Sequence, residues 1–182
     1  MRIVAGKYRH RIIEMTNLET TRETQDKVRG AIYNMVGPYF DGGNALDLFA
    51  GSGALGIEAY SRGMAKVWLN DINKEALEVC KKNVRSLQIK DDFTFTNLDY
   101  TVFCQNINVK FNLVLLDPPY KMDNIFDIIK IVYPILENDG ILVFEAKKES
   151  LYPLEYEDLK LWKNKEYGIK RVIVYRRIND EV

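Results

Sequence analysis

Four consecutive residues, Asp117-Pro118-Pro119-Tyr120, combine groups that could hold an amine during a reaction. They follow the apolar segment 113–116, and two consecutive prolines stop a strand and fix an extended backbone. The carboxylate of Asp117 and the carbonyl of Pro118 are then two neighbouring acceptors, which suits an amino group with two hydrogens to donate. Tyr120 offers a flat ring on which an extruded base can stack.

The chemistry favoured by this motif is transfer of a group to nitrogen. The exocyclic amine of a nucleobase is planar because its lone pair is spread into the ring. Accepting both N–H bonds on one side lets the nitrogen pyramidalise and direct its lone pair at an electrophilic methyl group, helped mainly by positioning and electrostatics. Asp117 is also a candidate acceptor for the released proton. The alternative is a purely structural role, in which the prolines only end a strand and Tyr120 packs at the edge of the hydrophobic core.

A glycine-rich segment, Gly51-Ser52-Gly53-Ala54-Leu55-Gly56, has the spacing G-x-G-x-x-G between an expected strand and an expected helix. Bare backbone at such a turn lets a ligand approach the strand end and the helix amino terminus. Asp71 ends the next expected strand, where it could accept hydrogen bonds from a ribose diol. Taken alone, this pattern also fits a dinucleotide, or a turn that needs glycine for structural reasons only.

Asp47 argues against NAD as the ligand. It lies in the apolar segment 45–49, where an ionised carboxylate is costly without hydrogen-bonding or charged partners. The ammonium or an ordered water of an amino-acid moiety could supply them, whereas the pyrophosphate of NAD would be repelled. Residues 47–56 resemble motif I of the class I methyltransferases, which use S-adenosylmethionine. By that resemblance, Asp71 holds the ribose hydroxyls, Asp99 meets the adenine amino group, and the cofactor-binding residues are Asp47, Phe49, Ala50, Gly51, Ser52, Gly53, Gly56, Asp71, Ile72 and Asp99.

The elements that must position these residues alternate along the chain. Strands are expected over 45–49, 66–69, 93–96, 111–116 and 140–144, and helices over 54–62, 73–87 and 123–136. Strands separated by single helices pair in parallel through right-handed crossovers, and a doubly wound sheet binds ligands at the carboxyl ends of its strands. A final antiparallel hairpin, expected over 159–165 and 170–178, is typical of class I methyltransferases.

We therefore expect an α/β class I methyltransferase (Rossmann-like) fold with a doubly wound, mostly parallel, seven-stranded sheet and an antiparallel C-terminal hairpin. A small N-terminal extension, residues 1–22, is predicted to form a β-hairpin from strands 2–5 and 8–13. A helix is expected from the N-cap Thr24 to Gly37-Pro38, with Val28, Ala31, Ile32 and Met35 at helical spacing. Residues 1–182 are expected to form a single domain.

Composition is ordinary for a globular chain, with 47% hydrophobic and 29% charged residues. The apolar runs are too short for a membrane span or a signal peptide, and Cys80 and Cys104 lack metal-ligand spacing. We expect a cytoplasmic monomer with reduced cysteines and no metal. The formal net charge is zero, but basic residues gather in 1–13 and 160–178. These ends fit a phosphate-binding face, or equally the solvated edges of hairpins.

Several segments together resemble the bacterial RsmD family of 16S rRNA (guanine-N2)-methyltransferases. Besides the glycine loop and Asp-Pro-Pro-Tyr, these are residues 1–9, 22–29 and 165–168, so the resemblance runs nearly end to end. It implies methylation of the N2 amine of one guanine in 16S rRNA, within the small ribosomal subunit, with S-adenosylmethionine as cofactor. The catalytic residues that it implies are Asp117, Pro118, Pro119 and Tyr120. The expected RNA-binding residues are Arg2, Lys7, Arg9, Arg11, Arg22 and Arg29. Glu23 replaces the usual proline of the family, which affects the local loop and not the class.

Other functions fit parts of the pattern. DNA adenine-N6 or cytosine-N4 methyltransferases share the Pro-Pro motif but usually carry a target-recognition domain, for which 182 residues leave no room. Protein-glutamine methyltransferases usually begin the motif with asparagine. An NAD-dependent oxidoreductase would explain the glycine loop and Asp71 but has no use for residues 117–120. A non-catalytic RNA-binding module would not need an intact cofactor loop.

Overall fold

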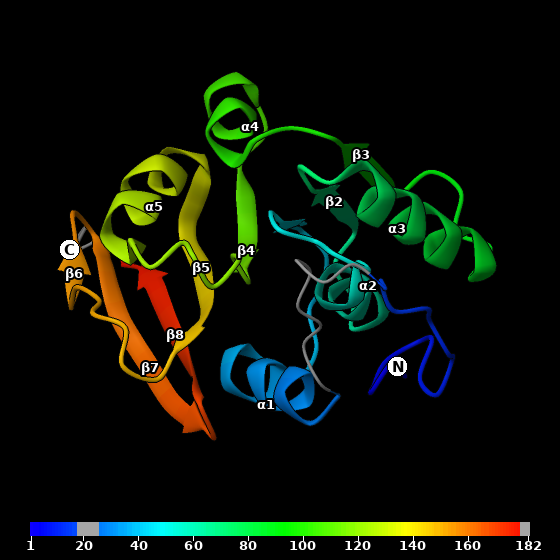
Figure 1. Cartoon of the computed structure of the whole chain (residues 1–182), viewed down its shortest axis with the longest axis horizontal. Coiled ribbons are helices and arrows are strands. Elements are labelled where there is room, and N and C mark those ends of the chain that lie inside the picture. The colour runs from blue at the N-terminus through cyan, green and yellow to red at the C-terminus, as the bar shows by residue number, and fades with distance from the viewer. Residues whose placement is uncertain (18–25, 179–182) are drawn as a thin grey trace.

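A mixed eight-stranded sheet with the order β3-β2-β1-β4-β5-β8-β7-β6 forms the centre of the molecule (Figure 1). The computed structural model describes residues 1–17 and 26–178. The parallel strands are β1 (Asn44–Asp47), β2 (Lys66–Asn70), β3 (Phe93–Thr96), β4 (Phe111–Leu116) and β5 (Leu136–Lys147). The antiparallel strands that follow are β6 (Glu155–Tyr156), β7 (Leu159–Tyr167) and β8 (Lys170–Arg177). The predicted architecture is confirmed, with the two-residue strand β6 added to the seven expected.

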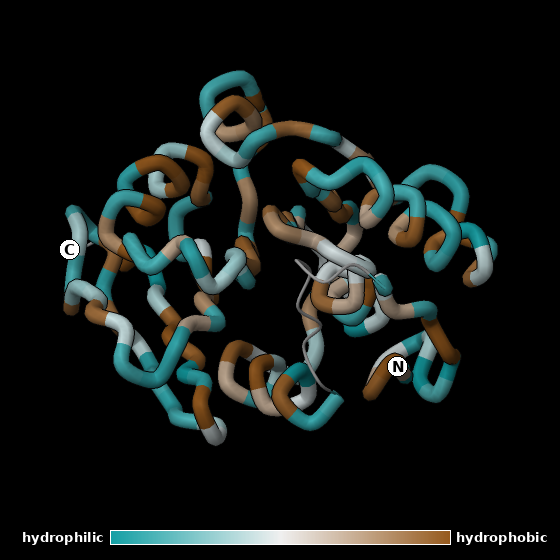
Figure 2. The backbone as a smooth tube through the Cα atoms, viewed as in Figure 1, coloured by the Kyte–Doolittle hydropathy of each residue, from teal (hydrophilic) through white to brown (hydrophobic). Residues whose placement is uncertain are grey.

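Helices cover both faces of the sheet because alternate strand residues point to opposite sides. Leu113 and Leu115 of β4 pack with the first three helices, while Val114 and Leu116 pack with the last two. Figure 2 shows apolar and polar residues alternating around the turns of the helices. The helices are α1 (Asp26–Val36), α2 (Ala54–Ser61), α3 (Lys74–Ser86), α4 (Tyr100–Asn106) and α5 (Ile125–Val132). None of those described is long and apolar enough to cross a membrane.

One helix ends earlier than predicted, and one helix was not predicted. The helix expected over 123–136 ends at Val132 and continues as a 3₁₀ turn, Tyr133–Ile135, because Pro134 has no N–H to continue an α-helix. The short helix α4 was not expected; Asp99 caps it by accepting a hydrogen bond from the backbone N–H of Thr101. The predicted N-cap Thr24 lies outside the described residues.

The N-terminal extension was predicted as two strands, and this was wrong in detail. A single antiparallel bridge joins Arg2 and Ile12, supported by backbone hydrogen bonds such as that from Ile13 N to Met1 O, 3.0 Å long. The backbone N–H groups of Val4 and Ala5 instead donate to the buried carboxylate of Glu58 on α2, at 2.9 and 3.0 Å. A strand ladder cannot continue where these donors turn toward a side chain.

Candidate active site

The glycine loop joins β1 to α2 at the carboxyl edge of the sheet. Gly51 and Gly53 have φ angles of +56° and +83°, a left-handed conformation that glycine adopts without strain. A Cβ on Gly56 would lie 2.4 Å from Cδ2 of Leu69 on β2. The absence of side chains therefore lets the loop turn sharply and lets α2 pack directly on the sheet.

Two carboxylates accept hydrogen bonds from the backbone of this loop. Asp71 Oδ2 accepts a hydrogen bond from Gly51 N at 2.8 Å, and Asp71 Oδ1 accepts one from Asn73 N at 2.8 Å. Asp47 is 1% exposed, and its Oδ2 accepts a hydrogen bond from Gly56 N at 3.0 Å. The partner seen for Asp47 is thus the first turn of α2, whereas the sequence suggested a ligand ammonium or water.

A cavity of about 180 Å³ lies beside the loop, at the carboxyl ends of β1, β2 and β4. It brings together four predicted cofactor residues, Phe49, Asp71, Ile72 and Asp99, with the first three residues of the Asp-Pro-Pro-Tyr motif. The other predicted cofactor residues are buried behind its wall: Asp47, Ala50, Gly51, Ser52, Gly53 and Gly56. Six further residues line the cavity and were not predicted: Leu48, Asn70, Asn73, Leu98, Tyr100 and Met122.

Asp99 is ionised where it borders this cavity. Its carboxylate accepts hydrogen bonds from the side chain and the backbone N–H of Thr101, and these lower the pKa of Asp99 below its ordinary value. An ionised carboxylate accepts hydrogen bonds and donates none. It therefore matches an amino group, such as the one on adenine, while Asp71 at the end of β2 offers acceptors suited to hydroxyls.

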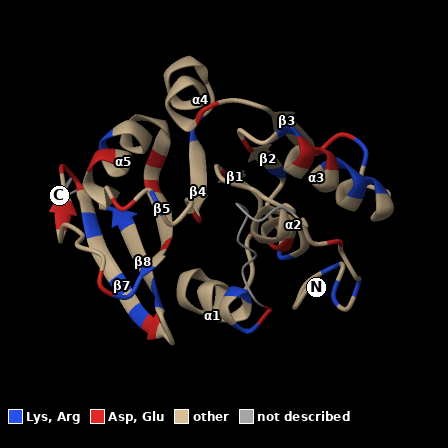
Figure 3. Cartoon of the chain, in the orientation of Figure 1, with Lys and Arg blue, Asp and Glu red and all other residues tan. Residues whose placement is uncertain are grey.

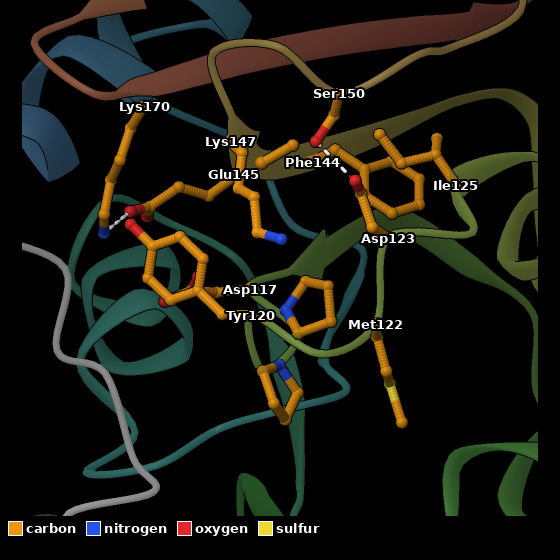
Figure 4. Close-up of a pocket in the computed structure, with 13 residues that line it drawn as sticks. Asp117, Tyr120, Met122, Asp123, Ile125, Phe144, Glu145, Lys147, Ser150 and Lys170 are labelled. Carbon is orange, nitrogen blue, oxygen red and sulfur yellow. Dashed lines mark hydrogen bonds and ion pairs between the residues drawn. The ribbon is translucent and has the colours of Figure 1, made fainter.

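A second pocket lies on the far side of the same prolines (Figure 4). Asp117, Pro118, Pro119 and Met122 border both spaces, so these residues form a common wall. Tyr120 lies only in the second pocket. The remaining side chains come from the loop after the motif, from β5 and the residues after it, and from β8: Asp123, Ile125, Phe144, Glu145, Ala146, Lys147, Ser150 and Lys170.

Sequence reasoning missed the contributions of β5 and β8 to this pocket. Glu145 is buried, and its carboxylate forms an ion pair with Lys170, the first residue of β8. The ammonium of Lys147 lies 5.6 Å from the centroid of the Tyr120 ring. The sequence did contain a signal for these residues. Glu145 and Lys147 lie at the carboxyl end of a parallel strand, which is where doubly wound sheets bind ligands.

The predicted RNA-binding residues fall into three groups. Arg2, Lys7, Arg9 and Arg11 are exposed on the N-terminal extension, which carries a cluster of basic residues in Figure 3. Arg22 lies outside the described residues. Arg29 was wrongly predicted: its side chain is fully buried and ion-paired with Glu58 and Asp26, so it is not accessible to a phosphate.

The family model described as conserved hypothetical protein 95 matches residues 1–176. The chain belongs to this family. Among its relatives, YlbH of Bacillus subtilis, named for an inferred rRNA methyltransferase activity, is 36% identical over 97% of this chain and 99% of its own length. Ribosomal RNA small subunit methyltransferase D of Haemophilus influenzae is 32% identical over 97% of this chain and 93% of its own.

Solved structures agree with the fold. The Escherichia coli protein yhhF, described as an inferred methyltransferase, superposes with a TM-score of 0.87 at 25% identity, over 99% of both chains. The family and this likeness together establish the class I methyltransferase fold for the chain described here. They also agree with the sequence resemblance to rRNA methyltransferases, which rested on the glycine loop, Asp-Pro-Pro-Tyr and residues 1–9, 22–29 and 165–168.

Proposed function

We propose that this protein transfers a methyl group from S-adenosylmethionine to the N2 amine of a guanine in 16S rRNA, within the small ribosomal subunit. One observation carries the proposal: a cavity with hydroxyl and amine acceptors meets a second, Tyr120-containing pocket across a wall made by Asp117 and two prolines. Two ligands that react at one point need such an arrangement. The relatives named as rRNA methyltransferases support the RNA substrate.

The residues fit S-adenosylmethionine, which supplies an electrophilic sulfonium methyl when it is bound. Asp71 would accept the ribose hydroxyls, Asp99 would accept the adenine amine, and Phe49 and Ile72 would pack around the adenosyl group. The carboxylate of Asp47 stands behind the glycine loop and orients the first turn of α2 through Gly56. The glycine loop, Asp71 and Asp99 would thus hold the cofactor in the cavity that Asp117 borders.

On the acceptor side, Asp117 and the carbonyl of Pro118 would take the two N–H bonds of the target amine. The carbonyl is held in place because Pro118 and Pro119 leave the backbone few conformations. Tyr120 would stack on the extruded base and keep its amine in line with the methyl group. The exposed residues Arg2, Lys7, Arg9 and Arg11 would contact RNA phosphates, so the rate should fall as salt is added.

The decisive experiment uses small subunits from cells that lack this protein. Their rRNA is mapped for a missing methyl group, and the same subunits are then methylated in vitro by the purified protein. Restoration of N2-methylguanine at the unmodified site is expected. An N6-methyladenine or N4-methylcytosine product would assign one of the alternative amines. Calorimetry with S-adenosylhomocysteine and NADH separates the classes, since binding of NADH alone would contradict a methyltransferase.

A further inference from the structure

One cation in the second pocket is available to a ligand. Lys147 is the last residue of β5, and its half-buried side chain points into the space beside Tyr120 and Asp123 (Figure 4). Its ammonium forms no ion pair and no hydrogen bond with any described residue, and it lies over the Tyr120 ring, 5.6 Å from the ring centroid. The three N–H donors of the ammonium are thus unused by the described residues, at the place where the target base is expected.

Three other charged groups of the pocket, Lys170, Glu145 and Asp123, already have partners. Lys170 stands directly opposite Lys147 in the β5–β8 register, but its ammonium is paired with Glu145. The carboxylate of Asp123 accepts a hydrogen bond from the Ser150 hydroxyl. Of the two lysines in the pocket, Lys147 is therefore the one that can donate to a new partner.

We propose that Lys147 is a specificity-determining residue, which donates a hydrogen bond to the carbonyl oxygen of the target base on the same ring as the methylated amine. This rests on the proposed function. In guanine that oxygen is O6, which lies meta to the N2 amine. Adenine held by its N6 amine carries a C–H group at the corresponding position and offers no acceptor there. Cytosine has a carbonyl meta to its amine, but its single ring covers less of Tyr120.

The position of Lys147 favours the base over a phosphate as its partner. Pro118, Pro119, Ile125 and Phe144 give the pocket apolar walls, and a flat base fits such walls better than a hydrated anion does. The ammonium also shares the pocket with the ring on which the base stacks. A hydrogen bond from a charged donor in such a setting is among the stronger ones available.

The test compares guanine with 2-aminopurine, which keeps the 2-amine and lacks O6. Small subunits are reconstituted with rRNA that carries one or the other base at the mapped site, and methyl transfer is measured for each. The wild-type protein should prefer guanine. In Lys147→Met, which keeps an unbranched stem beside Tyr120, the preference should fall by about 10-fold, mainly through slower reaction on guanine.

Lys148→Met is the matched control. Lys148 is the next residue, lies outside the pocket and pairs with Glu166 at 3.1 Å, so this variant should keep the wild-type preference. Equal losses on both bases in Lys147→Met, with a raised KM, would assign Lys147 to a phosphate and overturn the proposal. Failure of the wild-type protein to methylate any subunit would instead overturn the proposed function itself. Unchanged affinity for S-adenosylhomocysteine shows that Lys147→Met is folded.

Discussion

The carboxylate of Asp71 accepts a hydrogen bond from the backbone N–H of Gly51, 2.8 Å away. This contact joins the end of β2 to the loop after β1, so one side chain both shapes the glycine loop and borders the cofactor cavity. The role predicted for Asp71, as an acceptor for ribose hydroxyls, remains a prediction. The observed role is to tie together the two chain segments between which that ribose would lie.

Replacing Asp71 with alanine should weaken cofactor binding through both roles. The ribose would lose its acceptor, and Gly51 N and Asn73 N would lose theirs. Hydrogen bonds to charged groups are worth about 1.5–3 kcal/mol, so the Kd for S-adenosylhomocysteine should rise about 10- to 100-fold. Calorimetry measures this directly. An unchanged Kd would mean that the ribose binds elsewhere; Asp91→Ala, at an exposed position before β3, serves as the control.

Asp117→Ala should separate binding from reaction. Asp117 touches the cofactor cavity only at its shared wall, so affinity for S-adenosylhomocysteine should stay within about twofold. Methyl transfer to small subunits should fall by about 100-fold or more, because the target amine loses a preorganised charged acceptor. The measurement is single-turnover transfer of labelled methyl. Full activity in this variant would show that the motif is only structural.

Gly56→Ala should destabilise the contact between α2 and β2. The added Cβ would lie 2.4 Å from Leu69 Cδ2 and 3.2 Å from Asp47 Cβ, so either the buried Leu69 side chain or the helix must shift. Overpacking of this kind costs about 1–3 kcal/mol in the free energy of unfolding, measured by urea denaturation. Gly30→Ala is the matched control, because the nearest atom to its new Cβ is 3.4 Å away and alanine is the better helix former. Equal stability of the two variants would contradict close packing at Gly56.

Glu58→Ala should release the N-terminal extension from α2. The buried carboxylate accepts hydrogen bonds from Val4 N and Ala5 N and pairs with Arg29 and Arg62 at 3.3 and 2.8 Å. Its loss leaves two buried guanidinium groups without this carboxylate, which costs about 3–5 kcal/mol in the free energy of unfolding. Hydrogen exchange at Val4 and Ala5 should accelerate. Protection that stays at the wild-type level would show that other contacts hold the extension; Glu75→Ala, on the exposed face of α3, is the control.

The regular helices and strands were predictable because the spacing of their apolar residues differs between the two kinds of element. The parallel strands and their helices follow from short apolar runs and helical spacing, and the two motifs fall at strand ends where the fold places ligands. α4 was missed because its one strong signal is the cap Asp99, with little apolar repeat behind it. The N-terminal segment was predicted as two full strands because nothing in the local sequence shows that Val4 N and Ala5 N donate to Glu58, which is far away in the chain.

Arg29 shows why the buried face of α1 could not be predicted from the sequence. The expected apolar face of α1 was Val28, Ala31, Ile32 and Met35, whereas the buried residues are Arg29, Ile32, Tyr33 and Val36. The observed face has the same spacing but is turned by about one residue. From sequence alone, a charged residue near the start of a helix is predicted to be exposed unless its ion-pair partner is known. The partner of Arg29 is Glu58, which lies on another helix. Lys147 was missed for the same reason, since Tyr120 lies on a different strand connection.

The two spaces that meet at the common wall of Asp117, Pro118, Pro119 and Met122 are lined by different parts of the sequence. The cavity beside the glycine loop is lined by residues between Leu48 and Met122, whereas the second pocket also uses Asp123, Ile125 and side chains between Phe144 and Lys170. Substitutions in β5 and β8 can therefore reshape the proposed base pocket without changing a residue that lines the proposed cofactor cavity.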